Sequence, residues 1–515
     1  MNSSTLPINS YVIVGGGTAG WLTAAILIRV LENTNATITL IESPEVSTVG
    51  VGEATVPFLI DNLKFLDIPE TDFILKTNAT FKLGIKLTDW QNPGESYWHP
   101  FGDVGSKING WEFYQHWLKA NFNGDTSNYT DFSPCAVMAD AGKFYIPNPK
   151  KPNNLSTMGY ALHFDASLAA AYLSNYAQSR GVVHKQGHVE TVSKHEDGRL
   201  KSLVMKDGSS VKGDFFIDCT GQRALLIGEA LDVEYEDWSH YLPVNRAVVV
   251  QSEIAPSETK KSKTAQSKVQ GSLPPYTEAF AHEHGWRWQI PLQNRIGNGY
   301  VYASDYCSEE EATELLLKNI QGKPITEPRT IRFTTGKRKK MWHKNCVAIG
   351  LSSGFLEPLE STSIYLVSRA AMLFITMLPN MSLAKETESE YNRLMDSEYE
   401  NLRDFIVTHY CTSRRTDTAF WQDWQKRDIP PSLQNKLAFY KSQGRLIRND
   451  LDLFGPISWH SVLSGMGVFP EAYDPVVDAT IVAESHKYIK GVRASLIYSV
   501  NQLLTHSEYL ERLKL

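Results

Sequence analysis

The amino-terminal part of the chain changes its hydrophobic period within fifty residues. The stretch YVIVGGGTAGWLTAAILIRVL, which starts at Tyr11, predicts a short β-branched strand, a glycine turn and then a helix with apolar residues at helical spacing. The segment ATITLIES follows and predicts a second strand that ends at Glu42. This order of elements favours an α/β fold.

Later apolar runs continue the same alternation. GDFFIDCTGQRALL (213–226) predicts a strand that ends in Asp-Cys-Thr-Gly, and NCVAIGLSSGFLEPLEST (345–362) predicts a strand that runs into a Gly/Ser turn. STSIYLVSRAAMLFITML then predicts a long buried helix with Ser361 or Thr362 as its N-cap. From about Leu383 the pattern becomes amphipathic, which predicts a helical last third.

Composition and charge exclude several classes of protein. The formal net charge of −6 argues against nucleic-acid binding, because no basic excess is available to meet phosphates. The five cysteines form no Cys-x-x-Cys pair, which argues against a zinc site and favours a reducing compartment. No leader or membrane-spanning run is present, so we expect a cytoplasmic protein that does not bind a membrane. The 12 tryptophans and 23 tyrosines suit a flat aromatic ligand.

The glycine turn indicates a dinucleotide site. Gly15, Gly17 and Gly20 form G-x-G-x-x-G, in which the first glycine permits the tight turn and the second lets the backbone approach a pyrophosphate. The third glycine allows close packing of helix and strand, and the phosphate lies at the helix N-terminus. Glu42, 22 residues after Gly20, can accept hydrogen bonds from ribose hydroxyls.

FAD fits the rest of the chain better than NAD does. No second G-x-G-x-x-G occurs, so NADH has no obvious site of its own, and we expect another enzyme to reduce the flavin. The fold class expected is a two-domain FAD flavoprotein of the aromatic-hydroxylase type, with a Rossmann-like FAD domain and a mainly helical substrate subdomain. The FAD domain is expected over 1–380, with a substrate-side insertion at about 90–150 and a sheet at about 235–335. The helical domain is expected over 381–515.

Five motifs, in this order, carry a family resemblance: GGGTAGW, GVGEATVP, FKLGIK, GWRWQIP and EPLESTSI. Together they resemble the flavin-dependent halogenases of the tryptophan-halogenase family, and the likeness extends from Tyr11 to about Trp421. The family's signature W-x-W-x-I-P, beside the flavin, is supplied here by Trp286, Trp288, Ile290 and Pro291.

The resemblance implies a reaction and two catalytic residues. Reduced FAD, O₂ and a halide ion give hypohalous acid, which a lysine in a separate pocket receives for electrophilic aromatic substitution. Lys82 matches that lysine, and Lys86 is interpreted as structural. Glu360 matches the family's glutamate, which orients the oxidant or deprotonates the arenium intermediate. The sequence leaves open whether Lys82 acts as a charged donor or forms a haloamine, since a free lysine has a pKa of about 10.4.

Halide and flavin contacts also follow from the resemblance. The halide would lie on the backbone amides of Thr362 and Ser363, and the family pattern has glycine at the second position. We therefore expect that chloride is not privileged and that bromide or iodide is used better. The remaining flavin contacts expected are Gly16, Thr18, Ala19, Ser43, Val51, Ala54, Val189, Leu351 and Ile364.

The substrate side is less defined. YWHPFG resembles the family's H-P-F segment, so His99 and Phe101, in an aromatic loop, become pocket candidates, with Trp459 as a possible wall. The paired tyrosines and glutamate that grip free tryptophan have no counterpart. The expected substrate is therefore a small indole-like or phenolic aromatic molecule. Free tryptophan, a carrier-bound substrate and a homo-oligomer stay open.

Two other functions share part of this sequence pattern. An FAD-dependent aromatic monooxygenase would share the dinucleotide turn and the later strands, but it does not explain W-x-W-x-I-P together with Lys82 and Glu360. A non-catalytic binding protein on the flavoprotein fold would not need an intact phosphate turn followed by Glu42. The halogenase interpretation also implies a separate flavin reductase as a transient partner.

Overall fold

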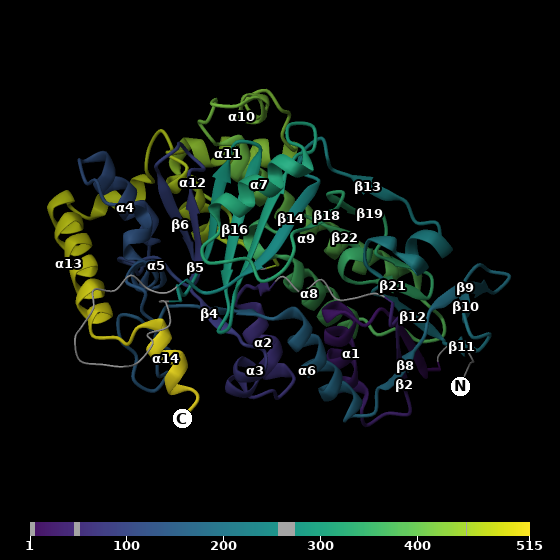
Figure 1. Ribbon diagram of the computed structural model, residues 1–515. Helices are drawn as coiled ribbons and strands as arrows, with labels where there is room; N and C mark the ends of the chain where they lie inside the picture. Colours follow the sequence, from purple (N-terminus) through teal and green to yellow (C-terminus); the bar gives the residue numbers. More distant parts are fainter. Residues whose placement is uncertain (1–5, 46–51, 256–272, 450) are drawn as a thin grey trace. The chain divides into compact units, whose positions relative to one another are not determined.

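The chain folds into two compact units that each combine distant segments. The computed structural model describes residues 6–45, 52–255, 273–449 and 451–515, so the expected flavin contact Val51 lies outside the described residues. Figure 1 shows the course of the chain. Unit 1 comprises Met1–Ala79, Phe164–Pro243 and Phe333–Glu400, and unit 2 comprises Thr80–His163, Val244–Arg332 and Asn401–Leu515.

Unit 1 is built on a six-stranded sheet. Its strand order is β20-β21-β12-β1-β2-β8, and all neighbours pair in parallel except β20 with β21. β1 is almost completely buried, as expected for a central parallel strand covered on both faces. The strands are β1 (Ser10–Val14), β2 (Thr37–Glu42), β8 (Val183–Gln186), β12 (Phe215–Asp218), β20 (Trp342–His343) and β21 (Cys346–Ala348).

Helices and two small sheets complete unit 1. Helix α1 begins directly after the glycine turn and packs against α6 and α8. A three-stranded sheet in the order β11-β10-β9 packs over β1 and β12 through a shared apolar cluster. The helices are α1 (Thr18–Leu31), α2 (Phe58–Phe65), α3 (Glu70–Lys76), α6 (Ala166–Gln178) and α8 (Ser363–Thr376). The remaining strands are β3 (Glu53–Ala54), β9 (Val189–Lys194), β10 (Leu200–Met205), β11 (Ser210–Lys212), β13 (Tyr235–Asp237), β19 (Gly336–Arg338) and β22 (Gly354–Phe355).

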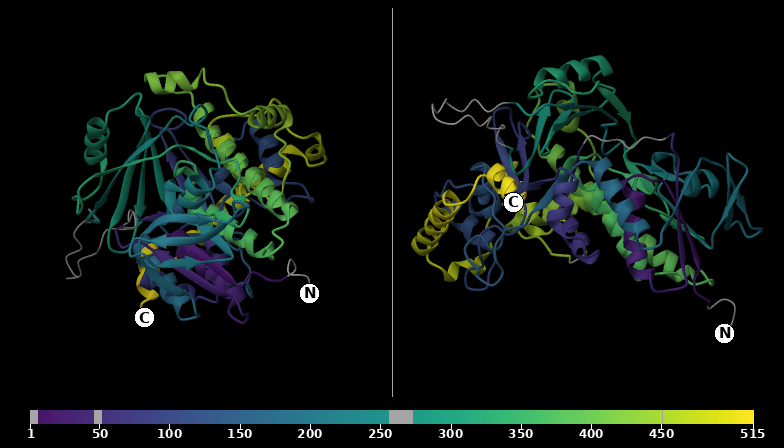
Figure 2. Two further views of the ribbon diagram at one scale, coloured as in Figure 1. Left: turned by 90° about the vertical axis from the view of Figure 1, so that its right-hand side faces the viewer. Right: turned by 60° about the horizontal axis from the view of Figure 1, so that its bottom comes forward.

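Unit 2 is built on a seven-stranded sheet in the order β18-β14-β17-β16-β15-β5-β6. Only β15 and β5 pair in parallel, and α7 packs on β14 and β17 (Figure 2). A short antiparallel pair joins β4 to β7. The strands are β4 (Thr80–Lys82), β5 (Gly84–Thr88), β6 (Ser96–Pro100), β7 (Ala161–Phe164), β14 (Arg246–Ser252), β15 (Thr277–His282), β16 (Gly285–Pro291), β17 (Ile296–Tyr302) and β18 (Arg329–Arg332).

The last third of the chain is helical, as predicted. Helix α9 begins in unit 1 and continues into unit 2, and the helices after it belong to unit 2. The helices not yet given are α4 (Phe113–Phe122), α5 (Pro134–Asp140), α7 (Glu309–Asn319), α9 (Lys385–Cys411), α10 (Ala419–Trp424), α11 (Pro431–Gln443), α12 (Pro456–Gly465), α13 (Val482–Asn501) and α14 (His506–Arg512). Within the described ranges, no helix has both the length and the apolarity that a bilayer crossing requires.

Candidate active site

The glycine turn of unit 1 is shaped by close backbone contacts. A Cβ on Gly15, whose φ is +117°, would lie 2.1 Å from the carbonyl oxygen of Cys219. A Cβ on Gly20 would lie 1.8 Å from the carbonyl oxygen of Gly15. A Cβ on Gly17 would have no heavy atom within 4 Å, so the chain leaves open space at the start of α1. Because the first N–H groups of a helix lack intrahelical acceptors, this space suits a pyrophosphate.

Glu42 lies beside this turn at the end of β2. A Cβ on Gly16 would come within 2.2 Å of the Glu42 carboxyl carbon, and the Nε2 atom of His184 lies 3.0 Å from Glu42 Oε2. Ser43 follows, with its hydroxyl oxygen accepting the N–H of Glu45 at 3.3 Å. The carboxylate is therefore held near the helix N-terminus, where a dinucleotide's ribose hydroxyls would lie.

The other expected flavin contacts in unit 1 lie in different environments. Val189 is buried in the apolar cluster under β9, and Ile364 is buried in the first turn of α8. Leu351 is 41% exposed, and a Cβ on its neighbour Gly350 would lie 3.0 Å from the Cβ of Ala19. The turn after β21 therefore approaches the start of α1. This contact links two segments that lie more than 300 residues apart in the sequence.

The backbone is strained immediately before α8. Glu360 has φ 70° and ψ 2°, and Ser361 has φ 59°, which is the left-handed region that side-chain-bearing residues rarely occupy. Both residues are buried. Such conformations cost on the order of 1–3 kcal/mol each and are typical of functional sites. The surrounding structure therefore maintains a strained backbone at Glu360.

The N-terminus of α8 lacks a side-chain cap. Thr362 occupies the N-cap position, with φ −87° and ψ −9°, and its side chain makes no capping hydrogen bond. Thr362 thus occupies the predicted N-cap position, but the expected capping hydrogen bond from its side chain is not formed. The first-turn amides of a helix have no acceptor within the helix, and a helix N-terminus of this kind can bind an anion.

Lys82 of unit 2 is completely buried. It ends β4 with 0% exposure, and its Nζ lies 5.2 Å from the centre of the Phe101 ring. An ammonium over an aromatic face is attracted by the ring quadrupole, which partly offsets the loss of hydration. Lys86 on β5 is only partly buried, and its Nζ lies 5.7 Å from the Trp98 ring. The two lysines of FKLGIK therefore have different environments.

A buried hydrogen-bond chain anchors the strand of Lys82. The Thr80 hydroxyl donates to the carbonyl oxygen of Pro291 at 2.6 Å and lies 3.0 Å from Nδ1 of His163. Nε2 of His163 lies 2.8 Å from the Thr277 hydroxyl. Burial, and next the charge of Lys82, hold the pKa of His163 well below its usual range, so this imidazole is neutral.

The W-x-W-x-I-P motif forms β16, in which every residue is buried. The Trp286 and Trp288 rings lie 5.9 Å apart. A Cβ on Gly299 of β17 would lie 2.1 Å from the Trp288 ring, so this glycine makes room for the indole. Pro291 ends the strand and accepts the Thr80 hydrogen bond described above. Thr80 thus ties the lysine strand to the tryptophan strand.

The predicted substrate residues belong to an aromatic cluster in unit 2. The His99 ring lies 5.3 Å from Phe405 and 5.4 Å from Phe454, and Trp459 lies 5.0 Å from Phe405. The segment of His99 was expected to be a loop, but it forms strand β6, in which every residue from Tyr97 to Pro100 is buried. Phe405 and Phe454 were not among the substrate residues predicted from the sequence. Phe454 begins the stretch that contains Trp459, whereas Phe405 gave no signal beyond the amphipathic pattern of its helix.

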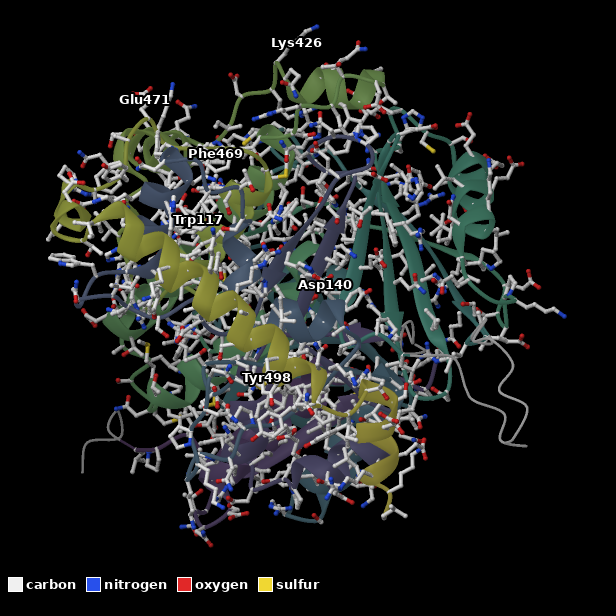
Figure 3. The ribbon with its side chains drawn as sticks, turned by 90° about the vertical axis from the view of Figure 1, so that its left-hand side faces the viewer. Trp117, Asp140, Lys426, Phe469, Glu471 and Tyr498 are labelled. Atoms are coloured by element: carbon white, nitrogen blue, oxygen red, sulfur yellow. The ribbon has the colours of Figure 1, made fainter. Side chains whose placement is uncertain are left out.

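A separate cavity of about 310 Å³ was not predicted. It lies between α5 and α13, on the face where Figure 3 labels Asp140 and Tyr498. Nη2 of Arg493 lies 3.0 Å from Oδ2 of Asp131, and burial raises the pKa of Asp140 against the opposing charge of Lys86. The cavity is lined by Asp131, Val137, Asp140, Ala141, Arg493, Ile497, Val500 and Asn501. Its two carboxylates exceed its one guanidinium, so its charge does not suit a halide ion.

The glycine turn and the open space before α1 in unit 1, and the buried lysine and tryptophan strands in unit 2, are features that fit a flavin-dependent halogenase. The solved structures agree. A flavin-dependent halogenase from Brevundimonas sp. BAL3, BrvH, superposes with a TM-score of 0.91 at 40% identity, covering 98% of this chain and 99% of that one. No group of three or more His, Cys, Asp or Glu side chains in the described part of the chain could hold a metal ion.

The chain belongs to the tryptophan halogenase family, whose model matches residues 10–481. It is 35% identical to the tryptophan 6-halogenase SttH of Streptomyces toxytricini, with 97% of each chain covered. It is 32% identical to the tryptophan 7-halogenase RebH of Lentzea aerocolonigenes, with 91% of each covered. It is therefore an oxidoreductase that uses FAD, reduced by a separate flavin reductase, together with O₂ and a halide.

Proposed function

We propose that this enzyme halogenates a small electron-rich aromatic molecule, indole-like or phenolic, with Lys82 and Glu360 as its catalytic residues. The observation that carries this proposal is the complete burial of Lys82 over Phe101 on an anchored strand. A lysine is rarely buried without a specific role, because removing its charge from water is costly. A site that receives a diffusible oxidant needs such a group.

The two catalytic side chains have complementary roles. The Lys82 side chain donates a hydrogen bond to hypohalous acid and makes its halogen more electrophilic, or as a neutral amine it bonds the halogen directly. The Glu360 carboxylate orients the oxidant and accepts the proton that the substituted ring carbon releases. The strained backbone at Glu360, a feature typical of functional sites, supports this role. Bound reduced FAD supplies the two electrons with which O₂ and halide form the oxidant.

The FAD site is proposed for the start of α1 and the segments around it. The space above Gly17 would receive the pyrophosphate, and Glu42 would bind the ribose. The W-x-W-x-I-P motif is proposed for the flavin side from the family resemblance. Residues 381–515 would supply the helical cover of the substrate. The proposed FAD contacts within the described residues are Gly15, Gly16, Gly17, Thr18, Ala19, Gly20, Glu42, Ser43, Ala54, Val189, Leu351 and Ile364.

For the halide, we propose the backbone amides of Thr362 and Ser363. The uncapped first turn of α8 supports this position. Ser363 carries a hydroxymethyl group where the family pattern has glycine, and the larger, more weakly hydrated bromide and iodide should tolerate the changed pocket better. Parallel turnover with chloride, bromide and iodide tests this, and a clear preference for chloride would overturn it.

For the substrate, we propose an aromatic ring held among His99, Phe101 and Trp459. The ring distances to Phe405 and Phe454 make this region of unit 2 aromatic rather than charged. SttH and RebH are tryptophan halogenases, whereas the clamp for the amino-acid backbone of tryptophan has no counterpart in this sequence. Competition between free tryptophan and plain indole decides the matter, and a strong preference for tryptophan would contradict the proposal.

The decisive experiment combines the protein with a flavin reductase, NADH, FAD and each halide, followed by mass spectrometry of an aromatic panel. Lys82→Met should lower product formation by about 100-fold or more, as expected for loss of an acid catalyst. Lys86→Met is the matched control, since that lysine covers Trp98 rather than Phe101, and it should retain activity. Undiminished halogenation by Lys82→Met would overturn the site, and oxygen insertion instead of halogenation would favour a monooxygenase.

A further inference from the structure

Unit 2 contains a series of neighbouring aromatic rings, most of them oxidisable, that starts at the W-x-W-x-I-P strand. The ring centres of Trp288 and Trp286 lie 5.9 Å apart, those of Trp286 and Trp90 6.2 Å, and those of Trp90 and Trp421 6.1 Å. Phe420 lies 5.1 Å from Trp421 and 5.6 Å from Tyr306. We call Trp288, Trp286, Trp90, Trp421 and Tyr306 the aromatic chain.

The inner members of the aromatic chain are shielded from solvent, and its far end reaches the surface. The four tryptophans are buried, whereas Tyr306 is partly exposed. Trp421 lies in α10, and Figure 3 labels Lys426, just beyond that helix, at the periphery of the molecule. The chain thus connects a buried motif with solvent through rings that are in van der Waals contact or nearly so.

Packing alone does not require indoles and phenols at these positions, because phenylalanine would fill similar space. Tryptophan and tyrosine are the aromatic side chains that give up an electron most readily. The Trp90 indole N–H donates to the carbonyl oxygen of Ala279 at 3.0 Å, and that of Trp421 donates to His282 at 2.8 Å. A carbonyl at the indole N–H stabilises positive charge on the ring, so both sites favour a transient radical cation.

The end of the chain has a proton acceptor. The Tyr306 hydroxyl donates to Oδ2 of Asp423 at 2.5 Å. The carboxylate can therefore take the phenol proton when the ring loses an electron. The guanidinium of Arg415, 4.8 Å from the Trp421 ring, would oppose a positive charge there, but it is paired with Asp417 at 2.7 Å. The field of the pair is weaker than that of the cation alone.

We propose that the aromatic chain is an electron-transfer path that protects the enzyme from one-electron oxidants formed at its flavin side. The proposal rests on the proposed function, in which the W-x-W-x-I-P strand faces the flavin. An oxygen- or halogen-centred radical takes one electron from Trp288 and becomes an anion. Trp286, Trp90 and Trp421 pass electrons inward in turn, and Phe420 only bridges. Tyr306 supplies the last electron, gives its proton to Asp423 and becomes a neutral tyrosyl radical.

A reductant in solution returns the Tyr306 radical to tyrosine. A thiol in solution gives one hydrogen atom, an electron with a proton, to the Tyr306 radical and becomes a thiyl radical. Two thiyl radicals combine to a disulfide. Asp423 releases to water the proton that it took from Tyr306, which returns the Tyr306–Asp423 pair to its starting protonation state. The oxidising equivalent thus leaves the protein without modifying the buried residues around Lys82.

The test uses the FAD-loaded protein without reductase or halide. Blue light makes oxidised FAD a one-electron oxidant, and electron paramagnetic resonance identifies the protein radical that remains. The wild type should give a long-lived tyrosyl signal. Trp90→Phe, which breaks the chain, should lose it, and Tyr306→Phe should replace it with a tryptophan radical.

Two control variants and a separate halogenation assay accompany the spectroscopic test. Trp117→Phe and Tyr498→Phe change a buried tryptophan and an exposed tyrosine elsewhere in unit 2, both labelled in Figure 3, and should retain the signal. If Trp90→Phe does not fold, the surface variant Tyr306→Phe decides alone. An unchanged tyrosyl signal in Tyr306→Phe, or none in the wild type, would overturn the path. Halogenation by the wild type tests the proposed function separately, since it does not depend on this signal.

Discussion

The buried hydroxyl of Thr80 gives a prediction whose size follows from the structure. Thr80→Val keeps the shape of the side chain and removes the donor to Pro291 and the partner of His163. Because Thr80 donates to a carbonyl, its oxygen accepts the Nδ1–H of His163, and Nε2 then accepts from Thr277. The valine variant leaves one carbonyl and one imidazole N–H buried without partners. Each such group costs about 1–3 kcal/mol, so we expect a loss of about 2–6 kcal/mol in the free energy of unfolding.

The assay is urea unfolding followed by tryptophan fluorescence, with wild type and variant at equal concentration. Thr313→Val is the control, because its hydroxyl donates to Glu309 on the exposed surface of α7 and its loss should change stability by less than about 0.5 kcal/mol. Halogenation should also fall in Thr80→Val, since Lys82 lies two residues further along the same strand. A loss below about 1 kcal/mol would refute the argument that this hydrogen-bond chain fixes the strand.

Further predictions concern acid stability, the glycine turn and halide choice. Burial is the main cause that holds the pKa of four histidines of unit 2 well below the usual range: His163, His282 (about 4), His460 (about 3) and His506 (about 4). In the unfolded chain these histidines take up protons near pH 6.5, whereas in the folded protein they stay neutral to lower pH. The free energy of unfolding should therefore fall as pH drops below about 6.5, by up to about 5 kcal/mol per pH unit. Measuring the urea midpoint at a series of acid pH values checks this, and a flat profile between pH 6.5 and 5 would contradict it. Gly20→Ala should lower the free energy of unfolding of the apoprotein by about 1–3 kcal/mol, because its Cβ meets the Gly15 carbonyl oxygen. Gly17→Ala should leave the melting temperature of the apoprotein unchanged and weaken FAD binding in a fluorescence titration. Equal melting temperatures for the two variants would contradict this prediction. Ser363→Gly should raise chloride turnover relative to bromide, and an unchanged ratio would remove Ser363 from halide selection.

Some features were predictable because they depend on neighbours in the sequence. The strand, glycine turn and helix at 10–31 involve contacts within a few residues, and the period of the apolar residues identifies them. The family motifs are local in the same way. The fold class inferred from them, an FAD-binding α/β fold with a helical C-terminal part, is confirmed.

Other features depend on long-range pairing and were not predictable. The segment of His99 looked like an aromatic loop, yet pairing with β5 makes it a strand. Phe405 enters the His99 cluster from a helix whose period shows that one face is buried but not against what. The Cα partners Thr80 and His163 are separated by 83 residues, and no local pattern reports such a contact.

The two lysines of FKLGIK illustrate which properties follow from the sequence and which follow from the tertiary structure. The sequence by itself determined the dinucleotide turn, the order of the motifs and the family, because each is written in consecutive residues. It placed Lys82 and Lys86 in one apolar run with nothing physical to separate them. Only the tertiary structure buries Lys82 over Phe101 and leaves Lys86 partly exposed over Trp98. The reason is that burial depends on which distant strands cover a side chain, and those pairings are decided by the whole fold.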